Sequence, residues 1–375
     1  MKKTENKDQF KIVEFIIYLL DYGYKELSSI PKDIFTEIHL RFFKKNTSPD
    51  KKILCCWDFN QRLSKAGDFM LIMEYFNILR HEFGLNLKKR NIDICFIDDK
   101  NHYNAKQLRF SKTYLFKKNI QTLVVTNPYI DSVFSFKSNR EFEIFYQQNR
   151  KRYLRWPPTV SGTIVADIRK IEEFYKKNRF IPQLSLPEDI LSEIYFFYEK
   201  YVYPSIPIVV NIRQNIRSSN RNTKLDEVKN FIKNYEKDKK YKFIIICNKS
   251  EIPEEFRKLK NTFFSKDFFD SVEYDLGFIK TSYISLFPSS GMACFAWFSD
   301  VPFIMYGDHG YNKYTSTPKG GKFNFCTEYQ RHYHQIETSE FLINVFEYLK
   351  KYLTENKINN NLKNKVKPRI NDAPF

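Results

Sequence analysis

A short turn at residues 287–291 carries residue types that are well suited to bind an anion. It has the sequence F-P-S-S-G, and the pattern around it predicts that a strand ends at Phe287 and a helix begins at Gly291. Such a turn presents backbone N–H groups and the hydroxyls of Ser289 and Ser290 toward one point, and Gly291 allows a ligand to approach the backbone closely. The chemistry expected here is phosphate binding. The alternative is that a serine only caps the helix.

Arginines follow another predicted strand, over residues 206–212. Arg213 and Arg217 lie at and just beyond its carboxyl end. A guanidinium group there can bind a diphosphate through two hydrogen bonds and can stabilise charge on a leaving phosphate without a metal. The alternative for Arg217, and for Arg221, is a surface arginine on a polar loop.

Alternating strands and helices in the second half must position these groups. Apolar runs predict strands over residues 206–212, 241–247, 261–265, 283–287 and 301–306. Helical patterns predict helices over 223–235, 253–260, 275–282 with Asp275 at the N-cap, 291–298 and 339–353. This order is typical of a doubly wound α/β sheet, whose ligand lies at the carboxyl ends of the strands. Ser289 and Arg213 are therefore expected at one crevice.

The first half also reads as an α/β layer on a mostly parallel sheet. We predict helical structure over residues 10–45, strands over 51–57, 91–97 and 122–126, and a helix over 69–83. Residues 135–160 fit no period and are interpreted as a linker, and a helix is predicted over 188–201. The predicted domains are an N-terminal helical segment (1–50), an α/β domain (51–160), a second α/β domain (161–354) and a flexible tail (355–375).

Composition narrows the class of protein. The chain has 375 residues, of which 42% are hydrophobic and 28% charged, so it can form about two cores and is not disordered overall. The formal net charge of +18 indicates an anionic partner: nucleic acid, acidic phospholipid or a phosphorylated small substrate. The six cysteines lie mostly in apolar runs with no C-x-x-C pair, which favours a reducing compartment. No predicted segment spans a membrane. We expect a cytoplasmic protein.

The order of these motifs resembles a known family. A strand ending in x-N/H-x-R, a helix led by E-Y-D-L (residues 273–276), a strand followed by S-S-G and a strand with proline together resemble the nucleotide-sugar half of GT-B glycosyltransferases, and most nearly the fucosyltransferase-like group. The resemblance covers residues 200–307. It departs from the family pattern at Asn211, where histidine is usual.

The resemblance implies a fold and an activity. It implies two Rossmann-like domains that face a cleft, and transfer of a sugar from a nucleotide-sugar donor to a hydroxyl of a glycan or lipid-linked acceptor, usually without metal or other cofactor. The family's arginine and Ser-Gly turn hold the donor diphosphate, so Arg213, Arg217, Ser289, Ser290 and Gly291 are the expected residues. The basic surface would then meet anionic lipid at the inner face of a membrane, and no specific nucleic acid is expected.

The remaining site residues follow from the same reading. The sequence A-G-D-F at residues 66–69 resembles the glycine loop of the acceptor domain, and Asp68 is the first candidate for the catalytic base, with Asp58 second. Asp68 could equally cap the helix, and Asp98 and Asp99 are further carboxylates. Loops after strand ends read the donor, and the expected donor nucleotide and sugar residues are Asn248, Asp275, Asp308 and His309.

Two other function classes stay open. A serine hydrolase would use Ser290 as nucleophile with Asp308 and His332, but the glycine that precedes the serine in such turns is missing. A basic nucleic-acid-binding protein would use the positive charge and the aromatic side chains, although no recognition motif appears. His309, His332 and His334 lack an acidic partner at an informative spacing, so no metal site is predicted.

Overall fold

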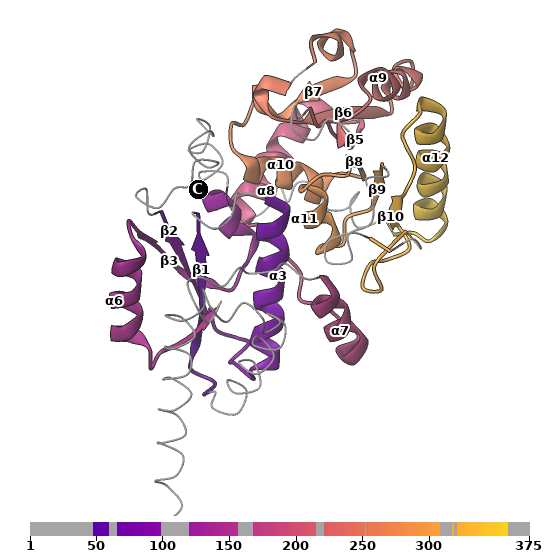
Figure 1. Cartoon of the computed structure of the whole chain (residues 1–375). Coiled ribbons are helices and arrows are strands. Elements are labelled where there is room, and N and C mark those ends of the chain that lie inside the picture. The colour runs from indigo at the N-terminus through magenta and orange to yellow at the C-terminus, as the bar shows by residue number, and fades with distance from the viewer. Residues whose placement is uncertain are drawn as a thin grey trace, which may run out of the picture. The chain divides into compact units, whose positions relative to one another are not determined.

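The computed structural model describes residues 48–59, 66–98, 120–156, 168–214, 221–251, 253–307, 317–318 and 321–358. They form two compact α/β units, each built on a parallel sheet (Figure 1). The first unit contains residues 48–59, 76–98 and 129–156, and the second contains the rest, including 66–75 and 120–128. The predicted domain boundaries stay predictions, and the helix predicted over 10–45 and most of the tail lie outside the described residues.

The first unit has a four-stranded sheet in the order β3-β2-β1-β4. Its strands are β1 (Lys52–Asp58), β2 (Ile92–Ile97), β3 (Ile130–Phe136) and β4 (Tyr153–Trp156), and neighbouring strands run parallel. Helix α6 (Asn139–Asn149) contributes Phe142 to a buried cluster with Leu54, Cys56, Cys95, Ile97 and Tyr153. β1 and β2 are apolar except for Lys52, Asp58 and Asp93, because both faces of a parallel sheet are buried.

Two predictions for this region are wrong. Residues 123–126, expected in a strand, form the 3-10 helix η2 (Leu123–Thr126), because so short an apolar run has no period that separates strand from helix. The supposed linker at 135–160 instead contains the end of β3, all of α6 and β4. Ser138 caps α6 by accepting a hydrogen bond from the N–H of Glu141. This helix start was missed because the residues around Ser138 are mostly polar.

The second unit has a six-stranded sheet in the order β10-β9-β8-β5-β6-β7. The predicted strands are confirmed as β5 (Ile206–Asn211), β6 (Tyr241–Ile246), β7 (Thr262–Phe264), β8 (Ile284–Pro288) and β9 (Phe303–Tyr306), and β10 (Gln330–Tyr333) is additional. All pairs are parallel. When the strands are numbered 1 to 6 from β5 to β10 and the sheet is read from β7 to β10, the order is 3-2-1-4-5-6. This is the doubly wound arrangement, and its switch point lies between β5 and β8.

Helices cover both faces of this sheet (Figure 1). α9 (Leu225–Asn234) packs with α12 (Ser339–Glu355), and α8 (Glu188–Phe197), which continues as a π-helix (Tyr198–Val202), packs with α10 (Val272–Thr281). The unit also contains α7 (Ile168–Asn178) and the five-residue α11 (Ala293–Trp297). Three short 3-10 helices lie between β6 and α10, at Lys249–Glu251, Glu254–Lys258 and Ser265–Asp267. None of the helices in the described ranges has the length and apolar character needed to cross a membrane.

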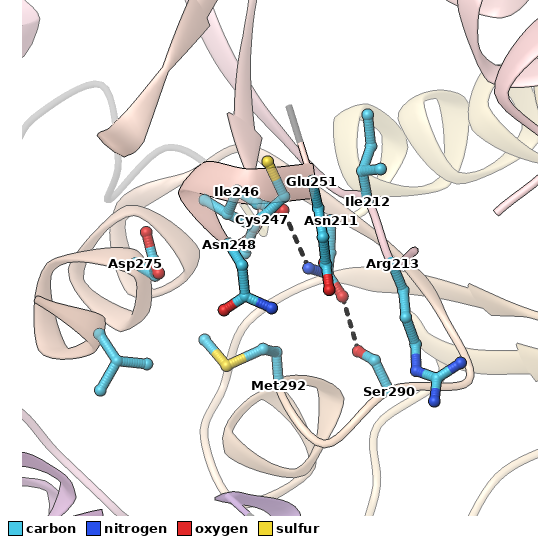
Figure 2. Close-up of a pocket in the computed structure, with 11 residues that line it drawn as sticks. Asn211, Ile212, Arg213, Ile246, Cys247, Asn248, Glu251, Asp275, Ser290 and Met292 are labelled. Carbon is cyan, nitrogen blue, oxygen red and sulfur yellow. Dashed lines mark hydrogen bonds between the residues drawn. The ribbon is translucent and has the colours of Figure 1, made fainter. Parts of the chain in front are cut away.

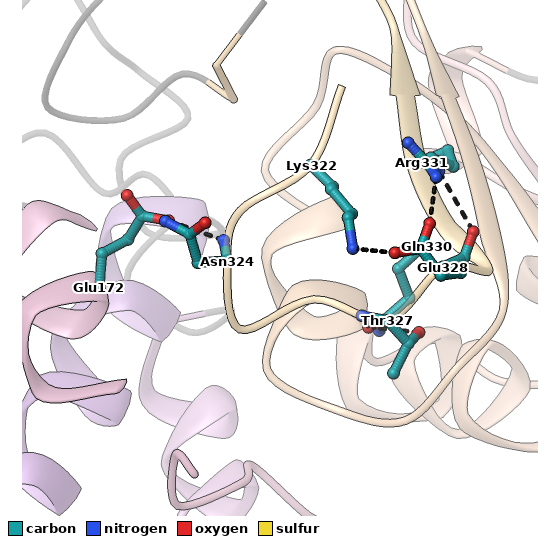
Figure 3. Close-up of polar contacts among 7 residues, drawn as sticks. All are labelled: Glu172, Lys322, Asn324, Thr327, Glu328, Gln330 and Arg331. Atoms are coloured by element: carbon teal, nitrogen blue, oxygen red, sulfur yellow. Dashed lines mark hydrogen bonds and ion pairs between the residues drawn. The ribbon is translucent and has the colours of Figure 1, made fainter. Parts of the chain in front are cut away.

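Polar contacts hold the segment that leads into β10 (Figure 3). Glu172 of α7 accepts hydrogen bonds from the backbone N–H and the Nδ2 of Asn324, at 2.7 and 2.9 Å. The side-chain amide of Gln330 donates to the carbonyls of Ala296 and Ser299, both at 2.7 Å. The ion pairs are those of Lys322 and Arg331 with Glu328. These contacts position a strand whose sequence, Q-R-H-Y, has no apolar signal of its own.

Candidate active site

A pocket of about 150 Å³ lies at the switch point of the second unit. Its lining comes from the carboxyl ends of β5 and β6, the 3-10 helix after β6, the first turn of α10 and the turn after β8. The lining residues that carry polar groups are Asn211, Arg213, Cys247, Asn248, Glu251, Asp275 and Ser290. The crevice expected from the strand order is therefore present, and it holds four of the predicted donor residues, Arg213, Ser290, Asn248 and Asp275.

Asn211 connects the turn after β8 to the end of β6. Its Nδ2 donates a hydrogen bond to the carbonyl of Ile246 at 3.0 Å, and its Oδ1 accepts one from Ser290 Oγ at 2.6 Å (Figure 2). Asn211 is only 5% exposed, and its bond to Ile246 is buried, while its bond to Ser290 is partly buried. Among the described residues, the backbone N–H groups of Gly291 and Met292 donate to no other group. These two donors remain for a ligand.

Two arginines lie beside this turn. Arg221 donates from Nε and Nη2 to the carbonyl of Ser289, at 3.1 and 2.5 Å, so it is not a solvated surface arginine. The backbone of Arg213 is held by Thr223, which donates its N–H to the Arg213 carbonyl at 2.9 Å and accepts from the Arg213 N–H at 3.0 Å through Oγ1. The Arg213 side chain reaches the pocket (Figure 2).

The positive charges of the Arg213 and Arg221 guanidinium groups repel each other. Burial lowers the pKa of Arg213, the neighbouring charge of Arg221 lowers this pKa further, and Glu251 partly offsets both effects. Burial also lowers the pKa of Arg221. Two partly buried cations beside a polar turn create a positive potential, and a bound anion would relieve their repulsion. Because α11 has only five residues, the arginines and the turn, rather than a long helix dipole, supply this potential.

The first turn of α3 (Ala66–Glu82) packs directly on the same turn. A Cβ atom on Gly67 would lie 2.9 Å from Gly291 Cα and 3.0 Å from Cys294 Sγ, and one on Gly291 would lie 2.8 Å from Gly67 N. Only glycine fits at both positions. The contact brings Asp68 near Arg221, since Cys294 and Asp68 both oppose the burial-induced fall in the pKa of Arg221. Asp68 was expected in the loop before the helix but belongs to its first turn.

Asp275 has a different position from the one predicted. α10 begins at Val272 with Ser271 at the N-cap, so the N-cap prediction for Asp275 is wrong. Asp275 accepts a hydrogen bond from Ser265 Oγ at 2.6 Å and pairs with Lys266 Nζ at 2.7 Å. Burial raises the pKa of Asp275, and Lys266 opposes that rise. The Asp275 carboxylate therefore holds Ser265 and Lys266 at the edge of the pocket. A contact of Asp275 with the donor stays a prediction.

Other predicted residues lie elsewhere or outside the described ranges. Asp58 ends β1 in the first unit and is buried, and Asp98 follows β2 in the same unit. Arg217, Asp99, Asp308 and His309 lie outside the described residues.

Sequence reasoning missed Glu251, which accepts a hydrogen bond from the N–H of Gln214 at 3.4 Å. Its place after the carboxyl end of β6 was the available signal.

The pairing that a serine hydrolase requires is not formed. Ser290 donates to Asn211, while His332 lies 2.8 Å from Thr317 Oγ1 through Nδ1 and 3.1 Å from the Gly307 carbonyl through Nε2. The ring of His334 lies beside that of His332, with 4.0 Å between the centroids. In the described part of the chain, no group of three or more His, Cys, Asp or Glu residues could hold a metal ion.

No protein-family model and no curated protein matches the chain. Among solved structures, it is similar to the Escherichia coli ADP-heptose LPS heptosyltransferase II, with 10% identity over 80% of this chain and 98% of that chain and a TM-score of 0.50. A glycosyl transferase family 9 protein from Veillonella parvula has 13% identity over 81% and 99%, with a TM-score of 0.47. E. coli heptosyltransferase WaaC with ADP has 10% identity over 80% and 99%, with a TM-score of 0.43. The likeness to heptosyltransferase II confirms the predicted fold class: two Rossmann-like units of the GT-B type.

Proposed function

We propose that this protein is a glycosyltransferase that moves a sugar from a nucleotide-sugar donor to a hydroxyl group of a glycan or glycolipid. The observation that carries the proposal is the convergence of Arg213 and Arg221 on the turn of residues 289–291, at the switch point of a doubly wound sheet. Strand order and cation placement are independent of each other, and both favour a phosphorylated ligand at this point. The fold shared with heptosyltransferase II supports the same class of reaction.

The donor diphosphate is assigned to the arginine side of the pocket. Arg213 and the N–H groups of Gly291 and Met292 supply donors, and Arg221 holds the turn through Ser289 while adding charge. The pocket volume of about 150 Å³ is close to that of a cavity that holds benzene. It suits one ring system of a nucleoside and not a whole nucleotide. ADP-heptose, the donor in the name of heptosyltransferase II, is one candidate.

The arginines also supply what the reaction needs. The acceptor oxygen bonds to the anomeric carbon while the bond from that carbon to the diphosphate oxygen breaks, and negative charge grows on the leaving diphosphate. Fixed guanidinium groups stabilise that charge in a partly dehydrated pocket. We therefore propose transfer without a metal or another cofactor.

Asp68 is the proposed base. The first turn of α3, which carries Asp68, packs on the turn of residues 289–291 (the donor turn) through the contact of Gly67 with Gly291. This contact keeps the Asp68 carboxylate beside the proposed diphosphate site. The proton of the acceptor hydroxyl would pass to this carboxylate as the new bond forms. Asp58 is the second candidate. The acceptor is proposed to be lipid-linked or part of a glycan, with the basic surface resting on anionic lipid at the inner face of the membrane in the cytoplasm.

A melting-curve screen tests the proposal. Nucleoside diphosphates that bind the native state raise its stability, by about 2.7 kcal/mol at a ligand concentration one hundred times Kd. We expect at least one of ADP, GDP, UDP and CDP to stabilise the wild type and to lose this effect in Arg213→Ala and Arg221→Ala. Arg331→Ala is the matched control, because Arg331, on β10, pairs with Glu328 and does not line the pocket. If no nucleoside diphosphate shifts the melting curve, the proposed function is wrong.

A further inference from the structure

The hydrogen bonds of Asn211 fix the direction of the Ser290 hydroxyl proton. The Ile246 carbonyl can only accept, so the Asn211 atom that faces it must be the donor Nδ2. Oδ1 therefore faces Ser290, and an amide oxygen can only accept. It follows that Ser290 donates its single proton to Asn211; Figure 2 draws the two successive hydrogen bonds.

This arrangement restricts what Ser290 can bind. A serine hydroxyl has one proton and two lone pairs, so Ser290 presents only acceptor sites to the pocket while the bond to Asn211 persists. Diphosphate oxygens are also acceptors at neutral pH. Ser290, expected from sequence to bind the diphosphate, cannot donate to it in this state.

We propose that Asn211 is a positioning residue, which holds the 289–291 turn through Ser290 and leaves the diphosphate to Arg213, Arg221 and the turn amides. The inference rests on the proposed function as far as the ligand is concerned. One buried amide here joins the ends of β5 and β6 to the turn after β8, beside the switch point between β5 and β8. Loss of either bond would free the turn and redirect the Ser290 proton.

The first test needs no ligand. Unfolding equilibria are measured for the wild type, Asn211→Leu, Ser290→Ala and the double variant, since leucine has a similar volume but neither donates nor accepts. If the two side chains act through one hydrogen bond, the unfolding equilibrium constants will be non-additive by roughly fivefold, the net value of such a bond. Additive effects would overturn the positioning role.

The second test measures binding of inorganic pyrophosphate and of ADP by calorimetry. We expect Asn211→Leu, Ser290→Ala and the double variant to weaken binding equally, on the order of tenfold, because each loosens the same turn. Asn211→His should bind within about threefold of the wild type, because a neutral imidazole can donate with one nitrogen and accept with the other. Ser290→Thr should behave likewise because it keeps the hydroxyl. A role limited to filling space would not be restored selectively by these two variants.

Two results would contradict the inference. Weaker pyrophosphate binding in Ser290→Ala with unchanged binding in Asn211→Leu would show that Ser290 donates to the phosphate itself. A double variant about a hundredfold weaker, the product of two independent losses, would lead to the same conclusion. Failure of the wild type to bind pyrophosphate or any nucleoside diphosphate would instead refute the proposed function, while the unfolding cycle would still decide whether Asn211 positions Ser290.

Discussion

Replacing Gly67 by alanine should separate the stability of the protein from its affinity for the donor. The new Cβ would lie 2.9 Å from Gly291 Cα and 3.0 Å from Cys294 Sγ, whereas ordinary contacts lie at 3.4–4 Å. One of the two segments must therefore move by about half an ångström, and the backbone atoms of Gly291 cannot rotate away. Overpacking of this kind costs about 1–3 kcal/mol.

The expected loss of stability is smaller than this steric cost. Gly67 lies in the first turn of α3, where alanine favours the helix by up to about 1 kcal/mol relative to glycine. A shift of α3 away from the turn would relieve the clash and leave the melting temperature almost unchanged. The cost would then appear in nucleoside diphosphate binding, which needs the turn in its native place, as a weakening of roughly 5- to 150-fold.

The measurement is calorimetric binding beside a melting curve, with Gly84→Ala as the control. Gly84 has a φ of +62° and no heavy atom within 4 Å of a built Cβ, so alanine there adds backbone strain of about 1–2 kcal/mol without a steric clash. Gly84→Ala should therefore melt earlier and bind normally, which is the reverse of the Gly67→Ala result. Wild-type affinity in a folded Gly67→Ala protein would refute the claim that α3 presses on the donor turn.

Three further predictions concern the reaction. Arg213→Ala should weaken nucleoside diphosphate binding by roughly 10- to 150-fold, the loss of one charge-assisted hydrogen bond of about 1.5–3 kcal/mol, and unchanged titration curves would sink the assignment. Asp68→Asn should lower the transfer rate by roughly 10² to 10⁴ in steady-state kinetics and leave donor affinity intact, and a wild-type rate would move the base to Asp58. Transfer should survive EDTA, because arginines meet the charge of the diphosphate; loss that Mn²⁺ or Mg²⁺ restores would show that a metal takes part.

The apolar strands of the second unit were predictable because burial dictates their composition. β5, β6, β8 and β9 lie inside the sheet, so both of their faces are covered and their sequences are nearly continuous apolar runs. Alternation with helices then implies parallel pairing, which places Arg213 and the 289–291 turn at one edge. The location of the candidate site followed from the sequence for this reason.

Edge elements and irregular turns gave weaker signals. β3 and β10 each pair on one side only, and β10 depends on its pairing with β9 and on the Gln330 side chain more than on apolar residues. β3 has no fully buried residue, and the buried residues of β10 are the polar Gln330 and His332, so neither sequence is an apolar run. Helix α6, which was mistaken for part of a linker, also gave a weak signal, because Phe142 is its one fully buried residue.

The tertiary structure alone decided the chemistry within the site. Nothing in the sequence around Gly67 and Gly291 shows that these two glycines touch, or that Asp68 thereby comes near Arg221. Likewise, only the position of the Ile246 carbonyl determines which way the Asn211 amide points and where the Ser290 proton goes. Burial leaves a mark on composition because it acts on every residue of a strand, whereas a single hydrogen bond or close contact depends on the placement of distant backbone atoms and leaves no local pattern.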